Sequence, residues 1–417
     1  MTKSDFTLNI VGGLIVGLML MGLAAYLKSF EPIIALVFAV TLAIIGLIWL
    51  VMLIKARRNK QQLSKEYTKN YSDLFGTRQK EIRSLVRRIE TGQSSAIIGS
   101  FESERTSMLD YIRHEDSEQR TKHYGDKGNK LIFSYLDIAT LSKKCSQAQF
   151  WQYALIALQE KMADENGLTL SKTYQACQDN QFDHFSLDKL IAQLKQENWR
   201  LVLMLDRFEE LLQRPYLNRP EFFGGLRTLA SSRNPSSLVL ILTLNNSILQ
   251  FHHKTKLLNP GSPYLNFMES GQMILGALLE KEIDSLLRQS VRQLSQEDCS
   301  FIKEKADGHP YLLHIAATTL WDAYDTGEKE AIKSAEIIFY DQVKVILNNV
   351  LHSWSANRCQ AFLSLARKLD VSGFKDELYE LKKQGFIKKD NHGEWQVCPR
   401  VFLDCVTDKT AQELCKK

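Results

Sequence analysis

Residues 95–107 read SAIIGSFESERTS, and their pattern determines the predicted fold. Ser95–Gly99 predicts a short apolar strand, and the polar residues after it predict a turn and the start of a helix. The same alternation of apolar strand and helical sequence recurs further along the chain. The later strands are expected at Leu131–Asp137 (LIFSYLD), Arg200–Asp206 (RLVLMLD), Ser237–Leu244 (SLVLILTL) and Met273–Leu275. Apolar strands that alternate with helices indicate a doubly wound α/β domain with a parallel sheet, reaching to about residue 276.

The sequence changes character after this region. Residues 278–350 predict helices alone, and further helices are expected at Ala356–Lys368 and Gly373–Gln384. Two short strands, Phe386–Lys389 and Glu394–Val397, then flank the turn-rich tetrapeptide DNHG, which is typical of a β-hairpin. Two helices followed by a hairpin predict a winged helix at the end of the chain.

Two runs without a charged residue precede the α/β region. Leu8–Leu27 has 20 residues and Ile33–Ile54 has 22. At about 1.5 Å of rise per residue, each run is long enough to cross a hydrocarbon core of roughly 30 Å as a helix. Pro32 suits the first turn of the second helix. The sequence therefore predicts a two-span membrane hairpin over residues 1–54. A cleaved signal peptide is the alternative, which the second run disfavours.

Basic residues follow the second run. They are Lys55, Arg57, Arg58, Lys60, Lys65 and Lys69, against the single acid Glu66. This bias predicts an integral membrane protein with both termini in the cytoplasm, and a basic stalk over residues 55–74 that contacts the lipid bilayer at anionic headgroups. Over residues 55–69, six basic residues less one acid give a net charge of +5, which equals that of the whole chain. The rest of the chain is close to neutral, which argues against a nucleic-acid footprint.

Gly99–Thr106 stands where a nucleoside triphosphate site has its phosphate-binding loop, after a strand and before a helix. That loop has the form G-x-x-x-x-G-K-S/T, in which the glycines bring backbone N–H groups to the phosphates, the lysine neutralises charge and the hydroxyl holds Mg²⁺. Gly99 and Thr106 match the motif, but Glu104 replaces the second glycine and Arg105 replaces the lysine. A carboxylate there repels a phosphate, and a planar guanidinium does not reproduce a compact ammonium. A strand–turn–helix with no ligand is the alternative.

An acid ends the buried strand Arg200–Asp206. At the carboxyl end of a parallel sheet such an acid commonly steadies Mg²⁺, so Thr106 and Asp206 are the expected metal ligands. The residue that follows is usually a second acid that polarises the attacking water, but here it is Arg207. Capping of the next helix is the alternative role for Asp206.

With its motifs in this order, the chain resembles prokaryotic STAND-type and related AAA+ P-loop ATPases over about residues 75–408. Leu74–Ile82 resembles a family box that precedes the phosphate loop, Leu201–Glu209 resembles the Walker B strand, and Ser237–Asn245 resembles the sensor-1 strand. Gly308–Leu313 (GHPYLL) resembles the G-x-P motif of the helical lid, whose proline packs near the adenine.

The resemblance implies a P-loop NTPase-like α/β domain at 75–276, a helical lid at 277–350 and a winged helix at 351–417. It implies catalytic roles for Asp206 and Glu209, and a site for ATP or ADP with Mg²⁺. The residues expected to contact this cofactor are Phe75, Arg78, Gly99, Glu104, Arg105, Thr106, Ser107, Asn245 and Pro310. Asn246 is the alternative to Asn245 at the sensor position.

Because Glu104, Arg105 and Arg207 replace groups that binding and hydrolysis usually need, we expect a degenerate nucleotide site. The leading hypothesis is a membrane-anchored regulatory, signalling or defence-related scaffold that acts through protein partners or as a homo-oligomer. One alternative is an active membrane ATPase in which Arg105 serves as the lysine and Glu209 or Glu210 as the missing acid. The other is a membrane-tethered regulator that binds nucleic acid through the winged helix, although acids are interleaved with its lysines.

Overall fold

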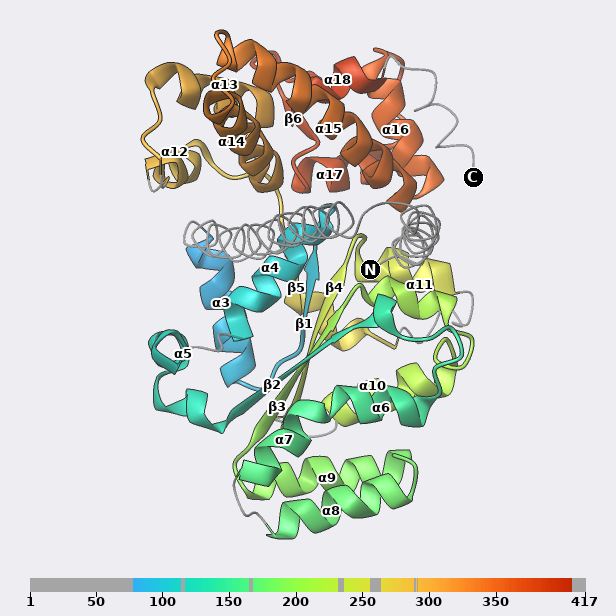
Figure 1. The fold of residues 1–417 in the computed structure, drawn as a ribbon. Coiled ribbons are helices and arrows are strands. Elements are labelled where there is room, and N and C mark those ends of the chain that lie inside the picture. The colour runs from blue at the N-terminus through green and yellow to red at the C-terminus, as the bar shows by residue number, and fades with distance from the viewer. Residues whose placement is uncertain are drawn as a thin grey trace, which may run out of the picture. The chain divides into compact units, whose positions relative to one another are not determined.

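The computed structural model describes residues 78–113, 117–164, 168–231, 236–255, 264–288, 290 and 292–406. All of these residues belong to one compact unit that begins at Tyr71. Five parallel strands form its sheet in the order β2-β3-β4-β1-β5 (Figure 1). The strands are β1 (Ser95–Ile98), β2 (Leu131–Asp137), β3 (Arg200–Asp206), β4 (Leu238–Leu244) and β5 (Gln272–Ile274). The predicted parallel sheet is therefore confirmed.

Helices cover both faces of the sheet, because side chains alternate between the faces along each strand. In β3, Leu201, Leu203 and Leu205 belong to one core cluster, whereas Val202 and Met204 belong to another. The second cluster packs against α3 (Gln79–Glu90), α4 (Glu102–Arg113) and α5 (Ser117–Tyr124). The first packs against α6 (Gln147–Ala154), α7 (Ile156–Asp164), α8 (Leu168–Asp179), α9 (His184–Gln196), α10 (Pro220–Ser231) and α11 (Ile248–Thr255) (Figure 1). Both faces are buried, which explains the continuous apolar runs of the strands.

The elements after β5 share a third core. The helices are α12 (Glu280–Arg288), α13 (Gln296–Ala306), α14 (Pro310–Asp325), α15 (Ala331–Ser353), α16 (Ala356–Ala366), α17 (Lys375–Lys383) and α18 (Val401–Val406). Between α17 and α18, β6 (Ile387–Lys389) pairs with β7 (Trp395–Val397) in an antiparallel hairpin. The order helix, helix, hairpin is the predicted one, and its identification as a winged helix stays a prediction. One residue of the α/β part, Phe101, also belongs to this core.

The helical stretch between Gln147 and Asp164 is divided in two. A break at Leu155 separates α6 from α7, and α6 begins at a capping box in which Ser146 and Gln149 exchange hydrogen bonds. Short 3₁₀ turns complete the described part: η1 (Gly125–Lys130), η2 (Ile138–Thr140), η3 (Phe208–Gln213) and η4 (Asn266–Gly271). Of these, η3 directly follows the predicted metal-binding strand and carries Glu209.

The predicted membrane architecture requires correction. Within the described ranges no helix is long and apolar enough to cross a bilayer, and the expected hairpin (1–54) and stalk (55–74) lie outside those ranges. The longest described helix, α15, has 23 residues but is amphipathic, since its buried residues recur every three or four positions along one face. The predicted two-span hairpin is therefore removed from the fold class, which is an α/β fold with a parallel sheet, and the integral-membrane localisation is withdrawn.

Candidate functional site

The connection between β1 and α4 is a three-residue turn. β1 ends at Ile98 and α4 begins at Glu102, so only Gly99, Ser100 and Phe101 lie between them. The second half of the expected phosphate-binding motif is thus helical. Leu275 lies close on the other side of Gly99, where an added Cβ would come within 3.3 Å of the Leu275 Cβ. The chain thus comes close to Leu275 at Gly99, and no wide loop follows this glycine.

Arg105 folds back over this turn. Its side chain is 3% exposed, and Nη1 donates a hydrogen bond to the backbone carbonyl of Gly99. Nη2 lies 3.7 Å from Oε1 of Glu209. The guanidinium therefore fills the space above Gly99 and pairs with the acid that was expected to be catalytic. Burial raises the pKa of Glu209, and the charge of Arg105 opposes that rise.

Glu104 points toward α14, a helix of the region that was expected to form a lid. Its side chain is 3% exposed, and Oε1 accepts the backbone N–H of Tyr311 at 3.0 Å in the first turn of α14. N–H groups in the first turn of a helix have no partner within the helix and attract anions. Burial raises the pKa of Glu104, while Arg78, the Tyr311 N–H and Arg105 favour the charged form. The carboxylate thus occupies an anion position between two arginines and the lid helix.

Asp206 is surrounded by donors. Oδ2 accepts the hydroxyls of Thr106 at 2.6 Å and Tyr135 at 3.0 Å. Oδ1 accepts the Thr243 hydroxyl and, at 3.0 Å, the backbone N–H of Arg207. Thr106 and Asp206, the expected metal ligands, are hydrogen-bonded to each other, and both oxygens of the Asp206 carboxylate already accept two hydrogen bonds. In this arrangement the residues do not fit a Mg²⁺ ion, which needs open oxygen ligands.

Arg207 pairs with an acid that the sequence analysis did not single out. Its Nε donates to Oδ1 of Asp137 at 2.8 Å, and its Nη1 lies 3.1 Å from Oε1 of Glu102. Asp137 ends β2 directly beside Asp206 at the end of β3 in the strand register. The sequence contained a signal for Asp137 as a site residue. Both strands end in Leu-Asp, and the carboxyl ends of parallel strands meet at one edge of the sheet. Arg207 itself has φ +52°, an uncommon left-handed conformation outside glycine.

The turn after β1 is covered by the C-terminal elements. The Ser100 hydroxyl donates to Oε1 of Gln384, which follows α17, and accepts Nε1–H of Trp354 at 3.4 Å. The Phe101 ring lies 5.6 Å from that of Tyr311 and 5.9 Å from that of Phe386, centroid to centroid. Lid and C-terminal residues therefore cover the segment that a phosphate would have to approach.

The other predicted contact residues are dispersed. Arg78 is buried and its Nη2 donates to the Gly276 carbonyl at 2.5 Å, in the connection between β5 and α12. Asn245 accepts a hydrogen bond from Asn246, and it is Asn246 that contacts the C-terminal part. Pro310 is the buried first residue of α14, and Ser107 lies in α4. Phe75 lies outside the described residues.

His309, before Pro310 at the start of α14, connects this helix to the segment between α17 and the C-terminal hairpin. Its Nε2–H donates to the Gly385 carbonyl at 2.9 Å, and its ring lies 5.4 Å from Phe101 and 5.1 Å from Phe386. Burial in this aromatic setting lowers the pKa of His309 from 6.5 to about 4. The imidazole is therefore neutral in the folded chain at neutral pH.

Acid is expected to destabilise the chain through His309. A histidine whose pKa is lowered by folding contributes stability that is complete above its unfolded pKa and is lost as the pH falls toward its folded pKa. Between pH 7 and pH 5 this residue alone should lower the free energy of unfolding by about 2 kcal/mol. Urea unfolding at both pH values measures this difference in unfolding free energy. The His309→Gln variant should lack the contribution of His309, whereas His392→Gln, at an exposed position, should retain it. An unaltered pH dependence in His309→Gln would refute the assignment.

Solved structures place this arrangement in a known fold class. The Walker-type ATPase PABY2304 of Pyrococcus abyssi is similar over 79% of this chain and 95% of its own, with a TM-score of 0.54 and 14% identity. The ORC2 protein of Aeropyrum pernix, solved with ADPNP and ADP, is matched over 81% and 94% with a TM-score of 0.48 and 12% identity. The first of these matches shows that the chain has a P-loop ATPase-like α/β fold. No protein-family model matches the sequence, and no curated protein sequence matches it.

Proposed function

We propose that this chain is a regulatory scaffold on a P-loop ATPase-like fold, in which its own side chains occupy the place of nucleotide phosphates. The proposal rests on the position and the partners of the Glu104 carboxylate. A buried carboxylate at the N-terminus of the lid helix, next to Arg78 and Arg105, has the charge and the partners that a phosphate would have. The lid is then held against the α/β part without a ligand.

Two further contacts support a site whose charged groups are paired within the chain. Arg105 bonds the Gly99 carbonyl and pairs with Glu209, so the two charges offset each other, while Arg105 Nε and Glu209 Oε2 are buried without a hydrogen-bond partner among the described residues. Asp206 accepts four hydrogen bonds, and a metal would have to displace some of them. A protein of this fold whose lid stays closed does not open and close with ATP hydrolysis. We therefore expect it to act by binding protein partners through its surface.

Part of the nucleotide machinery is nevertheless retained, which keeps ATP hydrolysis as a second candidate function. The 2.6 Å hydrogen bond between Thr106 and Asp206 joins the two residues that hold Mg²⁺ in active P-loop enzymes. In this reading Arg105 and Glu209 would have to separate so that one could meet a phosphate and the other a water molecule.

Phosphate release from ATP by the full chain separates the two candidates. The scaffold predicts no release with Mg²⁺ above that of the Asp206→Asn variant, which removes the charge but retains the shape. Turnover that Asp206→Asn and Arg105→Ala both abolish would overturn the scaffold and establish the ATPase. Circular dichroism of each variant checks that it is folded.

A further inference from the structure

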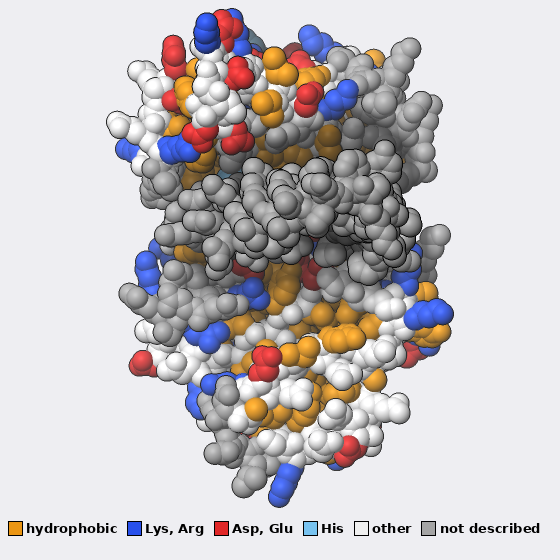
Figure 2. All heavy atoms as spheres, viewed as in Figure 1, with side chains coloured by type: hydrophobic (Ala, Val, Ile, Leu, Met, Phe, Trp, Pro, Cys, Tyr) orange, Lys and Arg blue, Asp and Glu red, His pale blue; other side chains and the backbone are white. Residues whose placement is uncertain are grey.

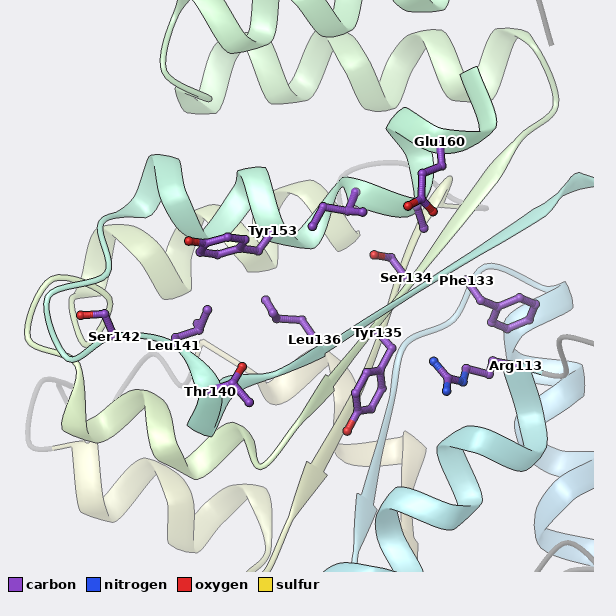
Figure 3. Close-up of a pocket in the computed structure, with 12 residues that line it drawn as sticks. Arg113, Phe133, Ser134, Tyr135, Leu136, Thr140, Leu141, Ser142, Tyr153 and Glu160 are labelled. Atoms are coloured by element: carbon purple, nitrogen blue, oxygen red, sulfur yellow. The ribbon is translucent and has the colours of Figure 1, made fainter. Parts of the chain in front are cut away.

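An open groove of about 500 Å³ follows the outer edge of the sheet. Four consecutive residues of β2, Phe133 to Leu136, line it (Figure 3). Neighbouring side chains of a strand point to opposite faces, so a groove that all four line follows the strand edge rather than one face. Hydrophobic side chains gather on this face of the molecule, over β2 and α6–α7 (Figure 2).

The edge of β2 lacks the features that usually protect an exposed strand. β2 is the outermost strand and pairs only with β3 among the described residues. Its sequence, LIFSYLD, contains no lysine, proline or glycine, and its single charge is the terminal Asp137. Long apolar edges of this kind are normally shortened, charged or covered, because their backbone groups pair readily with another strand. The edge is suited to an extended peptide.

The two sides of the groove carry opposite charges. On one side Arg113 pairs with Asp110 at 2.9 Å and lies over the ring of Tyr135. On the other side, which α6 and α7 form, Glu160 is exposed and Tyr153 and Ile156 are each 44% exposed (Figure 3). Arg113 thus brings a guanidinium to one side of the groove, and Glu160 brings a carboxylate to the other.

We infer that this groove binds an extended segment of a partner protein, which adds a strand to the sheet beside β2. Since adjacent side chains of the added strand point to opposite sides, the segment that fits carries an acidic residue next to a basic one. The acid faces Arg113 and the base faces Glu160, and apolar residues two positions before and after the base, on the same side of the added strand, contact Tyr153 and Ile156. This inference rests on the proposed scaffold function and names the kind of partner.

Tyr135 connects the groove with the candidate nucleotide site. Its ring lies in the groove under Arg113, and its hydroxyl donates to Oδ2 of Asp206 at 3.0 Å. A strand added at this edge contacts one end of a side chain whose other end holds the central carboxylate. Binding of a partner in the groove therefore acts on Tyr135, which contacts the closed site through its hydroxyl.

Selection of a phage-displayed library of random linear peptides on the full chain tests the inference. We expect enriched peptides with an adjacent acidic and basic pair between apolar residues. Ala157→Arg, which fills the groove, should weaken their binding at least about tenfold, whereas exposed Gln152→Arg on α6 should not. Glu160→Lys should weaken the same peptides about fivefold at low salt, and peptides with two acidic residues in place of the pair should regain that affinity.

Peptides that bind Ala157→Arg as tightly as the unchanged chain, or a selection without this pattern, would overturn the groove assignment. Neither result bears on ATP binding, which is measured separately. A chain that binds peptides in the groove and also hydrolyses ATP would refute the scaffold proposal while leaving the groove intact.

Discussion

Changing Glu104→Gly together with Arg105→Lys is expected to create ATP binding that the unchanged chain lacks. The double change removes the buried carboxylate between Arg78 and the N-terminus of α14, and restores the glycine and lysine of the phosphate-binding motif. It leaves the Tyr311 N–H without its carboxylate partner, so an incoming phosphate takes over that interaction. Glycine near the start of α4 also loosens the first helical turn by about 1 kcal/mol.

Fluorescence of a labelled ATP analogue in the presence of Mg²⁺ measures this gain. We expect a dissociation constant of about 0.1 mM or tighter for the double variant, and no saturation at about 1 mM for the unchanged chain. Glu104→Gln is the matched control, since it retains size and a hydrogen-bond acceptor for Tyr311 and should leave the site closed. Binding by the double variant that is no tighter than that of the unchanged chain would show that Glu104 and Arg105 do not exclude the nucleotide.

Arg358→Ala is expected to cost about 3–5 kcal/mol of unfolding free energy, because it removes one partner of a buried charged network. Arg358 is 1% exposed and donates to Asn246 Oδ1 at 3.1 Å and to Gln250 Oε1 at 3.2 Å, and its Nη2 pairs with Glu380. Burial lowers the pKa of Arg358 to about 10, so it stays charged at neutral pH. The network joins the segment after β4 to α16 and α17.

Urea denaturation gives the loss directly. Arg292 provides a control, since it forms a bidentate pair with Asp325 on the surface, and Arg292→Ala should cost about 1 kcal/mol or less. Adding Glu380→Ala to Arg358→Ala should recover part of the loss, because it removes the charge left without its partner. A cost below about 1 kcal/mol for Arg358→Ala would mean that this network does not hold the C-terminal part in place.

The strands were predictable because their residues are apolar on both faces. Leu131–Asp137 and Arg200–Asp206 have the predicted bounds, and β1 and β4 differ from the prediction by one residue. Burial on both faces leaves a local signal in each strand, a continuous apolar run bounded by polar residues. The pairing of Thr106 with Asp206 was predictable for a related reason, since both lie at the carboxyl edge of the sheet.

The partners of Glu104 and Arg358 were not predictable. Glu104 meets Tyr311 across 207 positions of sequence, and Arg358 meets Asn246 across 112. Such contacts depend on how helices pack after the chain has folded, and no local pattern records that packing. The C-terminal lysines illustrate the same limit, since Lys388 pairs with Asp307 near the start of α14, a partner that charge counting along the sequence does not reveal.

The charged residues of α17 include one that contacts the α/β part of the chain. The sequence suggested that its alternating acids and lysines suit a solvated or protein-contacting face. In the structure Glu380 accepts hydrogen bonds from Ser247 at 3.3 Å and from Gln250 at 2.5 Å, and Gln384 accepts one from Ser100. This helix therefore contacts the α/β part of its own chain, and binding of nucleic acid through the same face would require the two parts to separate.

Calorimetric titration of the unchanged full chain with Mg²⁺-ATP tests most directly whether its own side chains replace the phosphates. If Glu104 and Arg105 fill that place, no saturable heat is expected up to millimolar nucleotide, while the Glu104→Gly, Arg105→Lys variant gives a saturable isotherm. Saturable, Mg²⁺-dependent binding by the unchanged chain with a micromolar dissociation constant would contradict this account.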